Sequence, residues 1–223
     1  MASELRRERR EKQKRQRRQQ SRRREGGGLS SQLVVGGVVA AAIVLGILGL
    51  RAAGVFEPPA AAIDLNSAAF QVPAGTQIGT QEPLQDPVHI PVGQKASYNT
   101  VPPTSGQHWN QAGVAPAPWG IKDANLPNEV TTHNLEHGGI VIMYGPDVSS
   151  DQVNTLRLYV RQLQASGFPK IVLEPWPDMP KDSKVILTAW NWVMKLPGID
   201  QISIVKFTKA HHASSEAPEP SVP

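Results

Sequence analysis

The sequence of 223 residues contains no cysteine, and aromatic residues make up only 5% of it. The absence of cysteine excludes a disulfide framework, and it excludes every reaction or metal site that requires a thiolate. A metal site in this chain would have to use histidine, carboxylate, methionine or main-chain ligands. The stability of any folded domain must come from its core, because no covalent cross-link is available.

Negative charge is scarce at the start of the chain. Residues 1–25 hold 12 of the 23 Lys and Arg residues but only 4 of the 19 Asp and Glu residues, so their net charge is +8. The other residues carry 11 positive against 15 negative groups, a net charge of −4. This asymmetry is typical of a membrane protein whose basic flank stays in the cytoplasm.

An uncharged stretch follows the basic block. No charged residue lies between Glu25 and Arg51, and the 18 residues from Leu33 to Leu50 are all apolar or glycine. A run of roughly 17 to 25 such residues can cross a bilayer as a helix. We therefore expect a basic cytoplasmic tail over residues 1–30 and a transmembrane helix over residues 31–53.

A cleaved signal peptide is the main alternative to this anchor. Its apolar region is shorter, about 7 to 15 residues, and small residues precede the cut, where this chain has Arg51. A retained anchor makes the chain a single-pass protein of the cell membrane, with its N-terminus cytoplasmic and its C-terminal part extracytoplasmic. The lipid bilayer is then a partner, and the basic tail suits anionic lipid. We expect no nucleic-acid partner and leave an unidentified protein partner open.

The rest of the chain divides by composition. Residues 54–84, rich in Ala, Pro, Gly and Thr, predict a stalk, and residues 213–223 predict a disordered tail. Residues 85–212 are the expected extracytoplasmic domain. Its first part, residues 85–130, is dense in proline and glycine, which predicts a long loop region with one short strand near Val88–Pro91.

Regular elements are expected in the second half of this domain. Apolar runs rich in β-branched residues predict strands, and spaced apolar residues after a capping residue predict helices. The order β-α-β-β-α predicts an α+β fold, a small sandwich of one sheet with helices on a single face. The expected strands cover residues 139–144, 170–174 and 184–190, and the expected helices cover residues 151–165 and 201–212.

The stretch "TTHNLEHGG", residues 131–139, places two histidines and a glutamate just before an apolar strand. Residues four apart share one face of a helix but lie roughly 13 Å apart along a strand. His133 and His137 can therefore bind one ion only if a helical turn holds them. Thr132 before the pair and the two glycines after it are suitable start and stop signals for such a turn.

Two further histidines lie in the turn-rich first half. His89 falls in the expected short strand, and His108 falls in "PPTSGQHWN". Together with His133 and His137 they predict a metal site suited to zinc or copper(II), with Glu136 as a further ligand or as a group that orients one. The alternative is that each histidine bonds to the main chain and the domain is a non-catalytic interaction or scaffold module.

Enzymatic interpretations are weaker. The H-x-x-E-H spelling of residues 133–137 matches the inverted zincin motif, in which the glutamate is the general base. Pro127 leaves room for about one helical turn, and no later carboxylate is an obvious third ligand, so a zinc hydrolase ranks below both other hypotheses. Ser105 stands in a Pro-rich stretch that favours a loop over a nucleophile. We name no catalytic residue, and we assign no role to His211 and His212.

Four stretches carry a resemblance to a known family. "YNTVPPTSGQHW", "HNLEHGGIVIMYGP", "VILTAWNW" and the closing "APE", in this order and spacing, resemble the bacterial family known as domain of unknown function DUF3105. The likeness runs from about His89 to Glu219. It implies a single-span extracytoplasmic protein without an established activity, and it points to His108, His133, Glu136 and His137. One departure is Ile121-Lys122, where the family often has Gly-Val-Tyr, so a role for an aromatic residue there is not supported.

Overall fold

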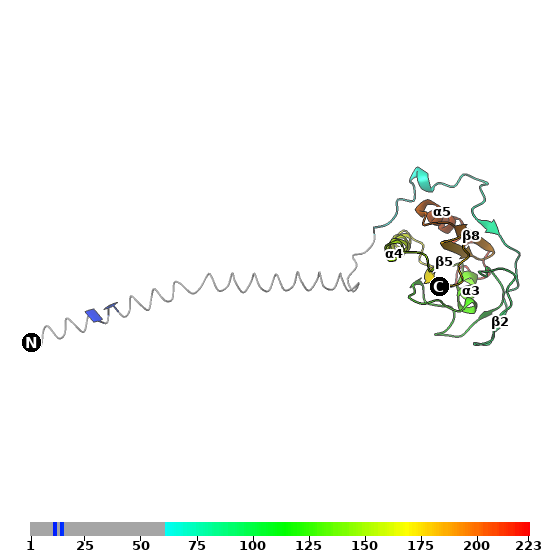
Figure 1. Cartoon of the computed structure of the whole chain (residues 1–223), viewed down its shortest axis with the longest axis horizontal. Helices are drawn as coiled ribbons and strands as arrows, with labels where there is room; N and C mark the ends of the chain where they lie inside the picture. The colour runs from blue at the N-terminus through cyan, green and yellow to red at the C-terminus, as the bar shows by residue number, and fades with distance from the viewer. Residues whose placement is uncertain (1–10, 13, 16–60) are drawn as a thin grey trace, which may run out of the picture. The chain divides into compact units, whose positions relative to one another are not determined.

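The computed structural model describes residues 11–12, 14–15 and 61–223. The expected transmembrane helix, most of the basic tail and the first part of the expected stalk therefore lie outside the described residues. No helix in the described part of the chain is both long and apolar enough to span a bilayer. Residues 61–223 form an α+β domain, and Figure 1 labels several of its elements.

The centre of the domain is a mixed six-stranded sheet. Strand β5 (Ile140–Tyr144) lies inside it, parallel to β6 (Ile171–Pro175) and antiparallel to β7 (Val185–Ala189). These three strands are almost entirely buried, as expected for continuous apolar runs that are covered on both faces. The order across the sheet is β1 (Thr80–Gln81), β8 (Trp192–Leu196), β7, β5, β6 and β4 (Gly120–Ile121).

Two helices cover one face of this sheet. Helix α4 (Ser150–Ala165) begins with a capping box, in which Ser149 and Gln152 each accept the other's main-chain N–H. Helix α5 (Gln201–His211) begins at Asp200, whose side chain accepts the N–H of Ile202. Both helices confirm the prediction. They pack on the sheet through the largest buried apolar cluster, which contains Leu156, Val160 and Leu163 from α4 and Ile204, Val205 and Phe207 from α5.

A third helix covers the opposite face. Helix α3 (Asn128–Glu136) packs there through Leu135. A separate parallel pair, β2 (His89–Ile90) and β3 (His108–Trp109), lies against α3. The α+β class and the short strand near residue 89 are confirmed, but the prediction of helices on a single face is wrong. Most of α3 is polar although it is buried, so its sequence shows no apolar period.

Strand β8 was not predicted. It forms a hairpin with β7, in which Ala189 pairs with Trp192, so only two residues connect the strands. One of them is Asn191, which has a positive φ of 68°. Asparagine tolerates this conformation better than most residues do. The turn signal is therefore a single asparagine inside "TAWNWVM", without the glycine that usually marks a hairpin.

Residues 61–84 pack against the domain, which corrects the expected stalk over residues 54–84 as far as the described residues reach. Strand β1 pairs with β8, and a short 3-10 helix, η1 (Ala68–Phe70), precedes it. The apolar side chains of this segment reach the main core; they are Ile63, Leu65, Phe70 and Ile78. Partial burial of these widely spaced side chains holds the segment on the domain, although its sequence has no regular hydrophobic period.

Residues 213–223 also pack against the domain, which corrects the expected disordered tail. Ala217 is buried, and the main-chain N–H of Glu219 donates to the carbonyl oxygen of Glu136 at 3.0 Å. The side chain of Lys170 donates to the carbonyl oxygens of Pro220 and Val222. This proline-rich segment is held through its main chain. Its amino-acid composition alone therefore does not predict that it packs on the domain.

Candidate metal centre

Helix α3 carries three of the expected ligands. His133, Glu136 and His137 stand at positions i, i+3 and i+4, so they project from neighbouring points of the helix end. The carbonyl oxygen of Pro127 accepts the N–H of Val130 in the first turn. The predicted helical turn is confirmed, and it belongs to a longer helix. Pro127 starts this helix without cost, because the first turn leaves N–H groups unpaired in any case.

Two glycines fix the exit from α3. Gly138 has a positive φ of 74°, and Gly139 donates its N–H to the carbonyl oxygen of Asn134 at 2.9 Å, as at many helix ends. A Cβ atom at Gly139 would lie 2.5 Å from the ring of Trp119. The chain therefore turns directly from α3 into β5, which sets the position of the last helical turn relative to the sheet.

Strands β2 and β3 bring the other two histidines. His89 is the register partner of His108, and their ring centroids lie 4.8 Å apart. The loop after β3 is held to α3 by Asn134, whose side-chain amide both donates to and accepts from the main chain of Ala117, at 2.8 and 3.0 Å. Glu129 accepts an N–H of the loop after β2 at 3.0 Å. Buried polar residues of α3 thus fasten the strand pair above the helix.

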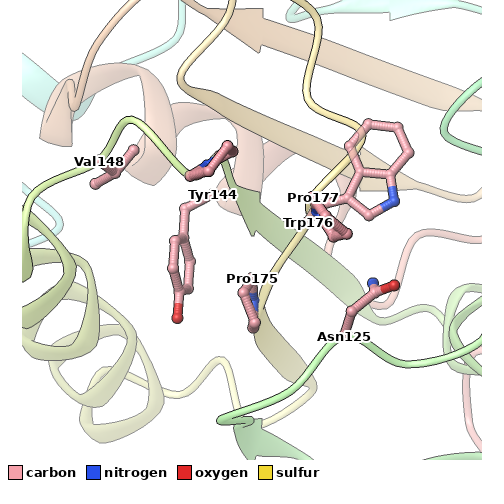
Figure 2. A pocket seen from close by; sticks show the side chains of 8 residues that line it. Asn125, Tyr144, Val148, Pro175, Trp176 and Pro177 are labelled. Atoms are coloured by element: carbon pink, nitrogen blue, oxygen red, sulfur yellow. The ribbon is translucent and has the colours of Figure 1, made fainter.

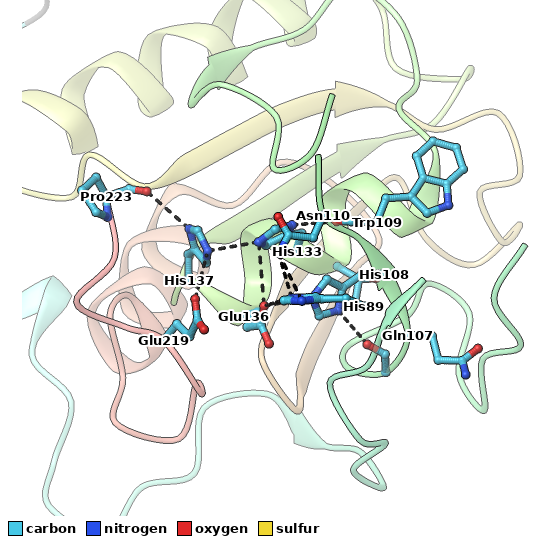
Figure 3. A network of polar contacts seen from close by, with 12 residues as sticks. His89, Gln107, His108, Trp109, Asn110, His133, Glu136, His137, Glu219 and Pro223 are labelled. Atoms are coloured by element: carbon cyan, nitrogen blue, oxygen red, sulfur yellow. Dashed lines mark hydrogen bonds and ion pairs between the residues drawn. The ribbon is translucent and has the colours of Figure 1, made fainter. Parts of the chain in front are cut away.

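One oxygen atom lies among these side chains, as Figure 3 shows. Oε2 of Glu136 is 2.9 Å from Nε2 of His108, 3.5 Å from Nε2 of His89 and 3.8 Å from Nε2 of His133. One potential ligand atom from each of the four residues lies within 4.8 Å of the others. Helix α3 and the β2–β3 pair each contribute two of these residues.

The far side of two of the rings faces a main-chain oxygen. Nδ1 of His133 is 2.7 Å from the carbonyl oxygen of Trp109, and Nδ1 of His108 is 2.9 Å from that of Gly106. Because a carbonyl oxygen can only accept, each Nδ1 carries a proton. In the neutral ring Nε2 then presents a lone pair, and in both residues it faces Glu136. A carbonyl behind the ring in this way is typical of metal-bound imidazoles.

Two buried atoms of the cluster have no hydrogen-bond partner. Nε2 of His108 and Oε2 of Glu136 are buried, and neither has a hydrogen-bond partner although they lie 2.9 Å apart. Burial lowers the pKa of His133 to about 4, although its bond to Trp109 opposes this. Burial alone would raise the pKa of Glu136, but its contacts with His108 and His89 hold the pKa below its usual value. The buried carboxylate of Glu136 thus lies 2.9 Å from Nε2 of His108, and a cation at this point, either a metal ion or a second proton on His108, would stabilise it.

The cluster lies within a region that matches a known family. Residues 89–223 match the family described as Protein of unknown function (DUF3105). The chain belongs to this family. No curated protein and no solved structure matches the chain. The predicted resemblance is confirmed, and the DUF3105 match contains every residue of the cluster while adding no reaction.

His137 lies at the edge of the cluster. Its Nε2 is 3.1 Å from Nε2 of His133, but it falls into a second group of potential ligands with Glu136 and Glu219. The expectation that His133, His137 and His108 share one ion is therefore corrected in part. His108 and His133 meet at Glu136, whereas His137 turns toward the C-terminal segment of this DUF3105 chain, because its Nδ1 side faces the main-chain oxygen of Pro223 at 3.3 Å.

The exposure of the four clustered residues is uneven. The side chains of His108, His133 and Glu136 are at most 4% exposed, while that of His89 is 45% exposed. Asn110 lies beside the ring of His89, with its amide nitrogen 3.1 Å from Nδ1. The side of the cluster that reaches solvent is therefore the side occupied by His89.

The other residues considered from the sequence are accounted for by structural contacts. The hydroxyl oxygen of Ser105 accepts the N–H of Gln85 at 2.9 Å, which agrees with a loop role. His211 is buried, with Nε2 2.7 Å from the carbonyl oxygen of Ile78, and the ring nitrogen of His212 accepts the N–H of Lys170. Both residues therefore hold α5 in place, so the expectation that they have no role is corrected to a structural role.

Glu219 was missed, because its segment was expected to be disordered. It lies in the closing "APE" stretch, which was used only as part of the family resemblance. That stretch was the available signal, because it is one of the four that carry the family resemblance and its glutamate is a potential metal ligand.

A separate hollow of about 360 Å³ lies at the ends of β5 and β6 (Figure 2). Its lining contains no charged residue and includes Asn125, Tyr144, Pro175 and Trp176. An uncharged lining offers no strong metal ligand. We assign no ligand to this hollow.

Proposed function

We propose that this DUF3105 domain binds one transition-metal ion, zinc or copper(II), through His108, His133, Glu136 and His89. The observation that carries the proposal is the convergence of Nε2 of His108 and His133 on the buried oxygen of Glu136, with no hydrogen-bond partner for His108 or Glu136 there. Three nitrogens and one carboxylate oxygen suit both metals.

The protein environment supports this ligand set. Main-chain oxygens of Trp109 and Gly106 fix the tautomers of two ligands before any ion arrives. Both bonds leave Nε2, the atom that points inward, free to coordinate. An ion would also neutralise the carboxylate, whose burial is otherwise unfavourable.

The geometry favours metal binding without catalysis. A hydrolase of the inverted zincin type needs its glutamate free as a general base and an open position on the metal. Glu136 is instead buried, and its oxygen lies among the three histidine nitrogens like a ligand. Only the His89 side reaches solvent, so a zinc hydrolase ranks third among the functions considered.

A scaffold domain with structural histidines is the second candidate, and one observation favours it. The separation of 2.9 Å between His108 and Glu136 also suits an ion pair, in which a second proton on His108 replaces the metal ion. The cluster would then stabilise the fold and bind nothing. This candidate and the metal-binding candidate differ in what added metal does to the protein.

We further propose that the domain works outside the cytoplasm, held to the cell membrane by residues 31–53. The charge asymmetry of the sequence and its uncharged stretch of 18 residues support this location. A metal site without cysteine also suits an oxidising compartment, where thiolate ligands would be lost to disulfides. The domain would then handle metal ions at the outer face of the membrane.

The test is the thermal stability of the purified full-length chain with and without added zinc or copper(II). An ion at 100 times its Kd stabilises the folded state by about 2.7 kcal/mol, which raises the Tm of a domain of this size by roughly 5 to 10 °C. The variant His108→Ala should lose this rise. The matched control His211→Ala should keep it relative to its own metal-free Tm, because His211 bonds to Ile78 away from the cluster. A wild-type Tm that no divalent ion changes would favour the scaffold function.

A further inference from the structure

The C-terminal segment, residues 213–223, brings a second carboxylate to the metal centre. Oε2 of Glu219 lies 3.4 Å from Nε2 of His137. One potential ligand atom from each of Glu136, His137 and Glu219 lies within 4.8 Å of the others. We propose that these three residues bind a second metal ion beside the first. This inference rests on the proposed function, because the two ions share Glu136.

Glu219 is held in place by the main chain of its segment. Its N–H donates to the carbonyl oxygen of Glu136 at 3.0 Å, and the N–H of Ala213 donates to that of Gly138 at 2.8 Å. Gly138 packs so closely that a Cβ atom there would lie 2.9 Å from Cα of Ala213. The segment is thus tied to the end of α3 at two points, and the carboxylate of Glu219 is directed at His137.

Lys170 clamps the same segment from the sheet. Its ammonium group donates to the carbonyl oxygens of His137 at 3.0 Å, of Pro220 at 2.7 Å and of Val222. One lysine therefore bonds at once to the end of α3 and to the residues that follow Glu219. The clamp fixes the distance between the two ligands without occupying either of them.

Acceptor atoms surround Nε2 of His137, and a cation there would satisfy them. This atom faces two acceptors, Nε2 of His133 at 3.1 Å and Oε2 of Glu219 at 3.4 Å, while Nδ1 faces the main-chain oxygen of Pro223. His133 cannot supply a proton, since the bond to Trp109 holds its own on Nδ1. Acceptors therefore lie on both sides of the ring of His137. A metal ion between His137 and Glu219 would satisfy the acceptors on the Nε2 side.

The two positions can be filled together. A carboxylate has two oxygens, so Glu136 can bind one ion with each, and paired metal ions in proteins lie about 3.5 to 4 Å apart. The inner position has mainly nitrogen ligands, whereas the outer one has one nitrogen and two carboxylates. The side chain of Glu219 is 46% exposed. The outer ion is therefore the one that binds more weakly and exchanges with the solvent.

The experiment is a count of bound zinc per full-length chain, by equilibrium dialysis against buffered Zn²⁺ followed by elemental analysis. The variant Glu219→Gln preserves the main-chain bonds of the segment and removes the charge at the outer position. Glu216→Gln is the matched control: Glu216 lies in the same segment but accepts from the ring N–H of Trp192 at 2.5 Å. Circular dichroism of each metal-free variant confirms that it is folded.

We expect two zinc ions in the wild type and in Glu216→Gln, with the weaker step shifted at least about tenfold to higher free zinc in Glu219→Gln. The variant His108→Gln should lose the tighter step. One ion that is lost in His108→Gln but unaffected by Glu219→Gln would overturn the second site and leave the proposed function intact. One ion lost in Glu219→Gln but unaffected by His108→Gln would overturn the proposed function. No bound metal in dialysis against either Zn²⁺ or Cu²⁺ would overturn both.

Discussion

His89 and His108 are register partners in the parallel pair of β2 and β3, yet the side chain of His89 is 45% exposed and that of His108 is 0% exposed. The two histidines therefore reach the same carboxylate from different environments. On its far side His108 is held by a main-chain bond, whereas Nδ1 of His89 lies beside the side-chain amide of Asn110. We infer that His108 is a fixed ligand and that His89 closes the site.

The first prediction concerns this difference. His89→Ala should weaken zinc binding by at least roughly 10-fold, because losing even a group that only orients a ligand costs about 10- to 100-fold. Its metal-free stability should stay within about 0.5 kcal/mol of the wild type, because nearly half of the side chain is exposed. His108→Ala should abolish binding and also destabilise the metal-free fold. Competition with a zinc chelator measures both affinities; equal losses in the two variants would contradict the assignment.

The second prediction concerns the clamp on the C-terminal segment. Lys170→Met keeps the length of the side chain but removes the donor to three carbonyl oxygens. Hydrogen bonds to a charged group contribute about 1.5 to 3 kcal/mol, so the main-chain N–H of Glu219 should exchange with deuterium at least roughly tenfold faster. Exchange within β5 should be unchanged. Unaltered exchange at Glu219 would mean that the segment is held without the lysine.

The third prediction concerns Glu174, a buried residue of β6. Burial raises the pKa of its carboxyl from 4.5 to about 7, although the N–H of Leu126 donates to it at 2.6 Å. Between these two values the folded state binds the proton and the unfolded state does not. Stability is therefore lost as the pH rises through this window, by roughly 3 kcal/mol in total.

The variant Glu174→Gln removes this titrating group. Urea unfolding at pH 5 and at pH 8 should show a smaller loss of stability with rising pH in the variant than in the wild type. The difference between the two proteins isolates Glu174, since all other groups are common to both. An identical pH dependence in the two proteins would show that Glu174 is ionised in the folded state throughout.

The fourth prediction concerns topology. Protease added to intact cells should degrade the domain of residues 61–223, because the basic block places the N-terminus inside. A cytoplasmic protein of the same cells should survive the treatment and serve as the control. Protection of the domain until the cells are lysed would reverse the proposed orientation.

The second half of the domain was predictable because its signals are local. Strands β5, β6 and β7 are continuous apolar runs, and Ser149 and Asp200 cap α4 and α5 through their own side chains. Helix α3 was underestimated, since most of its buried residues are polar, and Asn134 and Glu129 among them bond to distant loops rather than pack in the apolar core. Such pairings depend on the fold and leave no periodic trace in the sequence.

The candidate site was predictable in composition but only partly in geometry. The spacing of His133 and Glu136 on one helix follows from the helical period. The approach of His89 to His108 depends on a parallel pairing of two short strands, and Glu219 arrives through a segment held by main-chain bonds. These long-range contacts have no local signal, so Glu219 was missed and the place of His137 beside Glu219 was not predicted.

The most direct test of the account is a crystal structure of the domain grown with zinc, with diffraction data collected on both sides of the zinc absorption edge. We expect an anomalous difference peak about 2.0 to 2.1 Å from Nε2 of His108 and of His133, next to Oε2 of Glu136. The bonds from Nδ1 of these histidines to Gly106 and Trp109 should be retained. The absence of a peak among these residues, with His108 and Glu136 still in direct contact, would contradict the proposed metal site.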